Sequence, residues 1–245
     1  MTADIGALPD EMMLSLFVNG QELVSMLCEP EKLNCLAVGF LRSEDFITSL
    51  DEIAMMRICL EESLADIKLN HQLTALPAKR ILTSGCGADT TFEQGTNIRP
   101  ISSKWRVFPA QILSSVRLLQ RKPESQGEKG GTRRGMHASA LCDGNELIVS
   151  AEDIGRHNTL DKIWSECILM RIPTEDLLLV TTGRISSEML IKAAKMGIPV
   201  VASLNSATNR AVQLGADLGI TIVGYARSSR LSVFSGAERI QVTGN

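Results

Sequence analysis

The sequence lacks a long hydrophobic segment and any excess of basic charge. Its longest apolar stretch, residues 33–41, is interrupted by Asn34, Cys35 and Gly39 and is much shorter than the ~18 residues that cross a membrane. The 25 basic and 28 acidic residues leave a net charge of -3, and non-specific binding of nucleic acid needs a surplus of Lys and Arg. We therefore expect neither a membrane nor a nucleic acid as a partner.

The six cysteines are scattered and include no Cys-x-x-Cys pair. None has a nearby histidine at the spacing of metal ligands, so the sequence predicts neither a zinc ribbon nor a disulfide framework. Residues 1–9 also lack the basic start and the apolar core of a secretion signal. We expect a cytoplasmic protein without bound zinc.

The later part of the sequence alternates apolar strands with amphipathic helices. This alternation covers residues 137–225, whereas residues 1–105 combine a hairpin at Asn19-Gly20 with a helix and further strands. Nearly continuous apolar strands between helices predict a mixed sheet with helices on both faces. We therefore predict an α/β fold, with a larger domain over residues 106–245 and a smaller N-terminal α+β domain over residues 1–105.

Polar residues follow four of the strands expected in the larger domain. In such sheets, ligands bind outside the carboxyl ends of the strands. Four polar segments are therefore expected to converge on one rim of the sheet. They are residues 152–158, 181–188, 203–208 and 224–230.

Two of these segments have residue types that suit a nucleotide. Gly183 and Arg184 precede a predicted helix, where free backbone N–H groups and a guanidinium favour a phosphate. Tyr225, the only tyrosine, is followed by Arg227 and Arg230, a combination that can stack on a base and neutralise phosphates. The alternatives are simple helix capping in the first segment and a sheet-edge tyrosine in the second.

Cys86 differs from the other five cysteines. It lies between Gly85 and Gly87, and Lys79 and Arg80 are close enough in sequence to favour its thiolate. The other cysteines are in apolar or periodic surroundings, where a cysteine usually packs as a small hydrophobic residue. This pattern favours a reactive thiol at Cys86, with a tight structural turn as the alternative.

The three histidines are candidate acid–base groups. His157 is at a predicted helix start, where Asp153 or Asp161 would orient its ring for proton transfer. A structural histidine is the alternative for His157, and the same alternative applies to His137. His71 lies in a polar, irregular stretch and is expected to be exposed.

Several motifs occur together in a fixed order. Residues 152–158 read EDIGRHN and are followed by Asp161-Lys162, and residues 220–227 read ITIVGYAR. These segments are similar to the EDxGRHNxxDK signature and the closing strand of the FdhD family of formate dehydrogenase accessory proteins. The sequence resembles that family over nearly its whole length.

This resemblance implies a sulfurtransferase that forms a persulfide on a cysteine, and the persulfide site falls on Cys86. A cysteine desulfurase would supply the sulfur, which then passes to a molybdenum or tungsten bis-molybdopterin guanine dinucleotide cofactor before that cofactor enters formate dehydrogenase. The resemblance also implies a homodimer and a cytidine deaminase-like larger domain. It assigns contacts with the guanine dinucleotide to Tyr225, Ala226, Arg227, Ser228, Ser229 and Arg230, next to the phosphate site expected at Gly183 and Arg184.

The sequence departs from the family pattern in three places: at Asp89, at residues 133–137, which replace the commoner TGGxH, and at residues 204–208, which lack the proline of SAPT. Many members have a second cysteine where Asp89 stands, so a relay between two cysteines cannot operate here. A chaperone that binds the molybdenum cofactor without moving sulfur is therefore the alternative function. A nucleobase deaminase is disfavoured, because zinc deaminases need His-x-Glu and Pro-Cys-x-x-Cys and residues 137–139 lack the glutamate.

Overall fold

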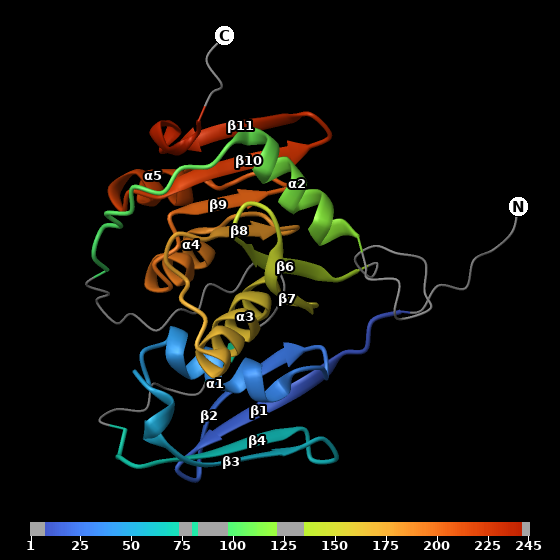
Figure 1. Ribbon diagram of the computed structural model, residues 1–245. Coiled ribbons are helices and arrows are strands. Elements are labelled where there is room, and N and C mark those ends of the chain that lie inside the picture. The colour runs from blue at the N-terminus through green and yellow to red at the C-terminus, as the bar shows by residue number, and fades with distance from the viewer. Residues whose placement is uncertain (1–7, 74–79, 83–97, 122–134, 242–245) are drawn as a thin grey trace, which may run out of the picture.

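The computed structural model describes residues 8–73, 80–82, 98–121 and 135–241. It contains two mixed sheets, and the described residues form five α-helices (Figure 1). The mixed α/β class predicted from the sequence is confirmed. No described helix has both the length and the apolar character needed to cross a membrane.

The first sheet is built around the predicted hairpin. Strands β1 (Met12–Val18) and β2 (Gln21–Cys28) pair antiparallel, and Asn19 (φ 51°) and Gly20 (φ 80°) form the turn between them. Both turn residues have positive φ, as a tight primed turn requires. Strands β3 (Ile53–Cys59), β4 (Leu64–Leu69) and β5 (Arg80–Leu82) complete a sheet of order β3-β4-β1-β2-β5.

Helix α1 (Leu33–Ser43) covers one face of the first sheet. Its apolar side chains and the alternate residues of β1, β2 and β4 form one buried core, because strand residues two apart point to the same face. The largest fully buried members of this core are Phe40, Leu14, Leu16, Leu23, Met26, Leu36, Leu41, Ile47 and Ile67.

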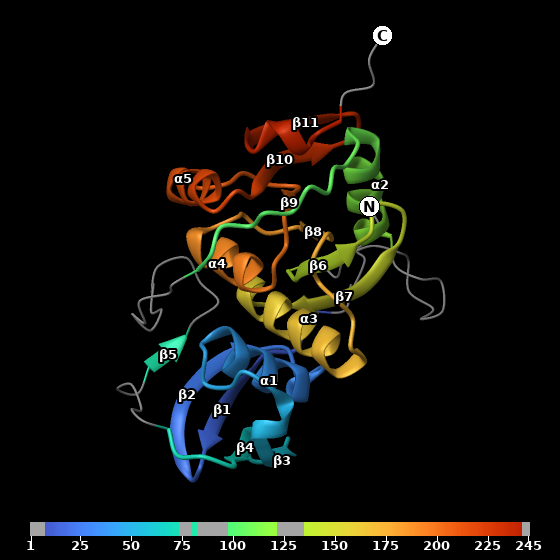
Figure 2. The ribbon, with the colours of Figure 1, turned by 60° about the vertical axis from the view of Figure 1, so that its left-hand side comes forward.

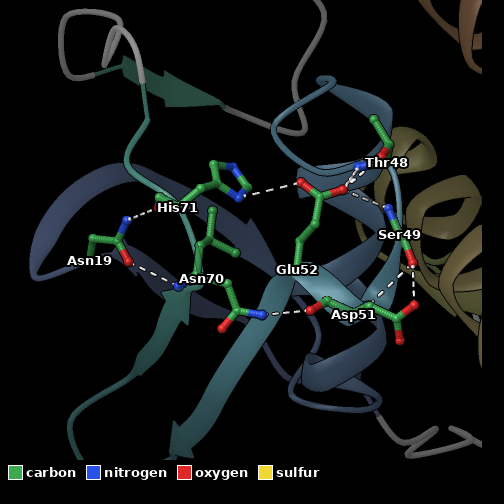
Figure 3. Close-up of polar contacts among 8 residues, drawn as sticks. Asn19, Thr48, Ser49, Asp51, Glu52, Asn70 and His71 are labelled. Atoms are coloured by element: carbon green, nitrogen blue, oxygen red, sulfur yellow. Dashed lines mark hydrogen bonds and ion pairs between the residues drawn. The ribbon is translucent and has the colours of Figure 1, made fainter.

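A network of polar contacts lies at the end of the first sheet that holds the β1–β2 turn (Figure 3). Asn19 accepts a hydrogen bond from Leu69 N (2.9 Å) and donates one to His71 O (3.0 Å). Glu52, in the short 3-10 helix Leu50–Glu52, accepts from Thr48 N (2.7 Å) and lies 3.5 Å from His71 Nδ1. His71 is exposed, as predicted, and it is fixed on this network.

The second sheet has the strand order β11-β10-β9-β8-β6-β7. Pairs β6–β7, β6–β8 and β10–β11 are antiparallel, and β8–β9 and β9–β10 are parallel. The carboxyl ends of β7, β8, β9 and β10 therefore lie at the same edge, which confirms the predicted single rim. The strands are β6 (His137–Cys142), β7 (Leu147–Asp153), β8 (Leu178–Thr181), β9 (Val200–Ser203), β10 (Thr221–Arg227) and β11 (Arg230–Ser235).

Helices cover both faces of the second sheet, as predicted. One core lies between the sheet and α2 (Pro109–Gln120), and the other lies between the opposite face and three helices. Figure 1 shows α2 on one side and the other three across the sheet. These helices are α3 (Arg156–Met170), α4 (Ser187–Lys195) and α5 (Asn209–Asp217).

The two sheets are joined through the packing of α1 on α3 (Figure 2). Residues 98–105, assigned to the smaller domain by the sequence, make contacts with the second sheet's core: Ile98 and Ile101 pack against it, and Ile101 N donates to Leu218 O (2.8 Å). The boundary at residue 105 stays a prediction.

Candidate functional site

The rim of the second sheet is held together by hydrogen bonds between neighbouring strand ends. Ser203 Oγ donates to Gly183 O (2.6 Å), and Asn205 Nδ2 donates to Thr182 O (2.7 Å). Thr182 Oγ1 accepts from Ala138 N (2.9 Å) on β6. These bonds fix the loops after β8 and β9 before any ligand binds, which lowers the ordering cost of binding.

A cavity of about 510 Å³ opens on this rim beside the end of α2. Its volume is within the range of small-molecule and cofactor sites. It brings together two of the predicted ligand-binding residues, Arg227 and Ser228, with side chains that follow β8 and β9. The lining residues are Gln120, Thr182, Leu204, Asn205, Arg227 and Ser228.

Arg227 is positioned by the loop after β9. Its Nε donates to Leu204 O (2.8 Å) and its Nη2 lies 3.5 Å from Asn205 Oδ1. A guanidinium carries five N–H donors, so these two bonds orient the group and leave donors for an anionic ligand in the cavity. A charge-assisted bond of this kind is about twice as strong as a neutral one.

Tyr225 has an unusual backbone conformation at the rim. Its φ of 50° is in the left-handed region, which costs energy for a bulky residue. Its N–H donates to Asn205 O (3.0 Å), and its ring packs edge-on with Phe234 at 6.2 Å between centroids. Tyr225 is 49% exposed. The surroundings therefore hold an aromatic ring half-exposed at the rim, where a base can stack on it.

The predicted end of the last strand was wrong. The predicted alternation ends at residue 225, but strand β10 continues to Arg227, and Arg230 begins strand β11, which the sequence did not predict. Arg227 and Arg230 are cross-strand partners, with the register shifting between Gly224 and Arg227. Ser228 and Ser229 thus form a tight connection between β10 and β11 at the rim.

Gly183 permits a close approach of two side chains. A Cβ at this position would lie 3.1 Å from Arg156 Cβ and 3.3 Å from His137 Nδ1. Burial lowers the pKa of His137, and the positive charges of Arg156 and Arg184 lower it further. His137 is therefore neutral at pH 7 beside two guanidinium groups, an arrangement that favours an anion.

Ser186 caps helix α4, so the capping alternative is confirmed for this residue. Its Oγ accepts from Met189 N (3.4 Å). Capping does not use Gly183 or Arg184, and Arg184 is exposed on the rim. The binding and the capping interpretations therefore apply to different residues of one segment.

The predicted partners of His157 were wrong. His157 Nε2 lies 3.2 Å from Ser186 Oγ and 3.2 Å from Glu188 Oε2. Burial and the nearby charges of Lys192 and Arg156 lower the pKa of His157 to about 3. The ring is neutral at physiological pH, and its described contacts are those of a structural histidine.

Asp153 and Asp161 form buried ion pairs instead. Asp153 Oδ2 lies 2.6 Å from Lys162 Nζ, and Asp161 Oδ1 lies 2.6 Å from Lys192 Nζ. Sequence reasoning missed the structural role of both lysines. The available signal was a lysine among the apolar positions of each helix, since lysine is almost never fully buried unless it is paired.

Four of the cysteines are buried, as expected for small hydrophobic residues: Cys28, Cys35, Cys142 and Cys167. Burial is the largest cause that raises their pKa, to about 12 for Cys28, Cys142 and Cys167. These thiols are therefore protonated at neutral pH. Cys86 lies outside the described residues, and among those described no group of three or more His, Cys, Asp or Glu is arranged to hold a metal ion.

The sequence model of the FdhD/NarQ family matches residues 9–241. The chain belongs to this family. It is 38% identical to "Sulfur carrier protein FdhD" of Staphylococcus aureus strain MRSA252 and 37% identical to the protein of that name from strain JH9, over 94% of this chain and 88% of each relative.

The fold is also similar to that of a solved structure. A crystal structure described as a formate dehydrogenase accessory protein from Desulfotalea psychrophila superposes with a TM-score of 0.75. The match covers 95% of this chain and 90% of that chain at 24% sequence identity. At this identity, the similarity supports the fold. The homodimer expected for FdhD proteins stays a prediction.

Proposed function

We propose that this protein is a sulfur carrier that takes sulfur from a cysteine desulfurase on Cys86 and passes it to a molybdenum bis-molybdopterin guanine dinucleotide cofactor destined for formate dehydrogenase. Membership of the FdhD/NarQ family and the names of the S. aureus relatives support the sulfur-carrier role. The similarity to the D. psychrophila protein, described as a formate dehydrogenase accessory protein, supports the link to formate dehydrogenase.

The observation that carries the proposal is the position of strand β5, which precedes Cys86 in the sequence. Strand β5 runs parallel to β2, with Leu82 opposite Met26, and β2 ends against the rim, where Asn158 Nδ2 donates to Leu27 O (2.8 Å). Cys86 follows Leu82 by four residues, and four extended residues span at most ~14 Å. The chain length therefore allows Cys86 to reach the rim.

The cavity lies farther along the same rim. Strand β8 is the second neighbour of β7 in the sheet, and two strand spacings amount to ~10 Å. Thr182, directly after β8, lines the cavity. A cofactor in the cavity is thus within reach of a thiol delivered at the β7 end of the rim.

The loading step is a thiol–persulfide exchange. The Cys86 thiolate attacks the outer sulfur of the desulfurase persulfide, a new S–S bond forms on Cys86, and the S–S bond of the desulfurase breaks with its thiolate as leaving group. No net oxidation occurs. In the delivery step, the outer sulfur bonds to the metal, the S–S bond on Cys86 breaks, and the metal supplies the two electrons that convert this sulfur to sulfide. Cys86 returns as a thiolate.

We assign the guanine dinucleotide part of the cofactor to the rim. The half-exposed ring of Tyr225 provides a stacking surface, and Arg227 provides oriented donors for a phosphate. A second site that can bind an anion lies at Gly183 and Arg184, with Arg156 and the neutral His137 beside them. The rest of this proposed set consists of Ala226 in β10, Ser228 and Ser229 in the β10–β11 connection, and Arg230 at the start of β11.

Intact-protein mass spectrometry tests the proposal. The protein is incubated with a cysteine desulfurase and cysteine, then measured with and without a thiol reductant. We expect a reductant-labile gain of one sulfur atom that is lost in Cys86→Ala and retained in Cys59→Ala, the matched control among the described thiols that are not fully buried. The absence of any gain in folded protein with an active desulfurase would overturn sulfur loading and favour the cofactor chaperone.

A further inference from the structure

The end of β2 is fixed to the start of α3 by a buried polar cluster. Asn158 Nδ2 donates to Leu27 O (2.8 Å) and to Asp153 Oδ1 (2.8 Å). Asp153 Oδ2 accepts from Glu29 N (3.3 Å). The bond from Asn158 to Leu27 and the bond from Glu29 to Asp153 each join residues more than 120 positions apart in the chain.

Lys162 completes this cluster. Its ammonium lies 2.6 Å from Asp153 Oδ2, 3.5 Å from Glu29 O and 3.3 Å from Glu152 O. The side chains of Lys162 and Asp153 are 1% and 0% exposed. We call Asp153, Asn158 and Lys162 the inter-sheet cluster, because each contacts both the rim of the second sheet and either Leu27 at the end of β2 or Glu29 directly after it.

The inter-sheet cluster connects the strand before Cys86 with the candidate binding site. Leu27 directly follows Met26, which pairs with Leu82 at the end of β5. On the other side, Asn158 is in the first turn of α3, two residues after Arg156, which packs over Gly183. A short series of direct contacts therefore fixes the end of β5 relative to the rim.

A buried ion pair is a poor source of stability, because desolvation of both charges offsets their attraction. It is strongly directional, however, since each buried donor and acceptor must keep its partner. The packing of α1 on α3 holds the two sheets together, and the cluster adds directional hydrogen bonds at the end of β2. The cluster is thus better suited to set a position than to add stability.

We infer that Asp153, Asn158 and Lys162 are positioning residues that set the distance between the end of β5 and the nucleotide rim, and that they govern the delivery of sulfur rather than its loading. This inference rests on the proposed function. Loading occurs with a partner protein and needs only an accessible thiol. Delivery needs the thiol and the bound cofactor at a fixed distance and orientation to one another. A displacement of ~1 Å between reacting groups can reduce a rate ~100-fold.

The test compares Asn158→Ala with Lys195→Met. Lys195 also joins the two sheets' units, through Asp45 Oδ2 (2.6 Å) and Ser43 O (2.6 Å), but it is not part of the inter-sheet cluster. Three quantities are measured for each variant: persulfide loading by mass spectrometry, affinity for GDP by calorimetry, and restoration of formate dehydrogenase activity in a strain that lacks its own carrier.

We expect Asn158→Ala to keep wild-type loading and GDP affinity and to reduce the restored dehydrogenase activity at least about tenfold, while Lys195→Met keeps all three. A merely structural role would instead lower loading and GDP affinity together with delivery. Wild-type restoration by Asn158→Ala would overturn the inference. If Asn158→Ala does not fold, Asn158→Ser keeps a short polar side chain and is expected to show the same selective loss.

Failure of the proposed function gives a different result. If the wild-type protein itself acquires no sulfur, the carrier role fails before the variants are compared. If the wild-type protein is loaded and restores activity, and Asn158→Ala does the same, the carrier role stands and the positioning role is wrong.

Discussion

Gly39 on α1 lies directly against the backbone carbonyl of Asp161 on α3. A Cβ at Gly39 would collide with the carbonyl oxygen, carbon and Cα of Asp161, and backbone atoms cannot move aside as a flexible side chain can. The glycine therefore sets how closely the two helices, and with them the two sheets, approach one another.

We expect Gly39→Ala to destabilise the protein by about 1–3 kcal/mol or more, the usual cost of overpacking a well-packed contact. Urea unfolding followed by circular dichroism measures this change. Asn34→Ala, at an exposed position of the same helix, is the control and should change the free energy of unfolding by less than about 0.5 kcal/mol. If Gly39→Ala is as stable as the wild type, α1 and α3 can move apart without cost, and Gly39 does not set their distance.

Lys192→Met leaves the buried carboxylate of Asp161 without its ammonium partner at 2.6 Å. We expect the free energy of unfolding to fall by about 3–5 kcal/mol, because the remaining charge is buried and unpaired. The double variant Asp161→Asn, Lys192→Met removes both charges and should recover most of the loss. A denaturant double-mutant cycle measures the coupling, and independent, additive effects would contradict a buried pair.

His157 makes the fold sensitive to acid. Its pKa is about 3 in the folded protein and near its ordinary value of 6.5 in the unfolded chain, so below pH ~6.5 the unfolded chain binds a proton that the folded protein excludes. The stability that His157 contributes is thus fully present above pH 6.5 and is lost progressively as the pH falls toward 3.

Urea titrations between about pH 7 and pH 5 check this sign. The free energy of unfolding of the wild type should fall with decreasing pH, and His157→Gln should show a shallower slope even if it is less stable at neutral pH. In this window most carboxylates remain ionised, so their titration contributes little. Identical slopes in the two proteins would show that His157 is not buried in its neutral form.

Arg227→Ala is expected to weaken binding of GDP about tenfold to a hundredfold, the cost of removing a charge-assisted hydrogen bond. Persulfide loading should be unchanged, because Arg227 is oriented by Leu204 and Asn205 at the far part of the rim. Titration calorimetry measures the affinity. The control is Arg210→Ala, an exposed arginine on α5, and a GDP affinity equal to the wild type in Arg227→Ala would contradict the assignment.

Local sequence signals predicted much of the fold. The Asn19-Gly20 turn, the alternation of strands and helices and the four polar segments all appear in the structure, because turn chemistry and hydrophobic periodicity act over a few residues. Strand β11 was missed because its short run RLSVFS pairs only with β10 at the sheet edge and follows directly after Ser228 and Ser229. Its formation depends on the neighbouring strand.

Some features of the candidate site likewise follow from the sequence, and others depend on the fold. The residue types that follow the strands can be read directly from the sequence, and the alternation of strands and helices then places Gly183, Tyr225 and Arg227 at one rim. The partners that Asp153, Asn158 and Lys162 find depend on the tertiary fold, because the fold brings Leu27 and Glu29 to them from the end of β2. Burial then pairs each carboxylate with the lysine that can satisfy it, and no spacing along the chain encodes that choice.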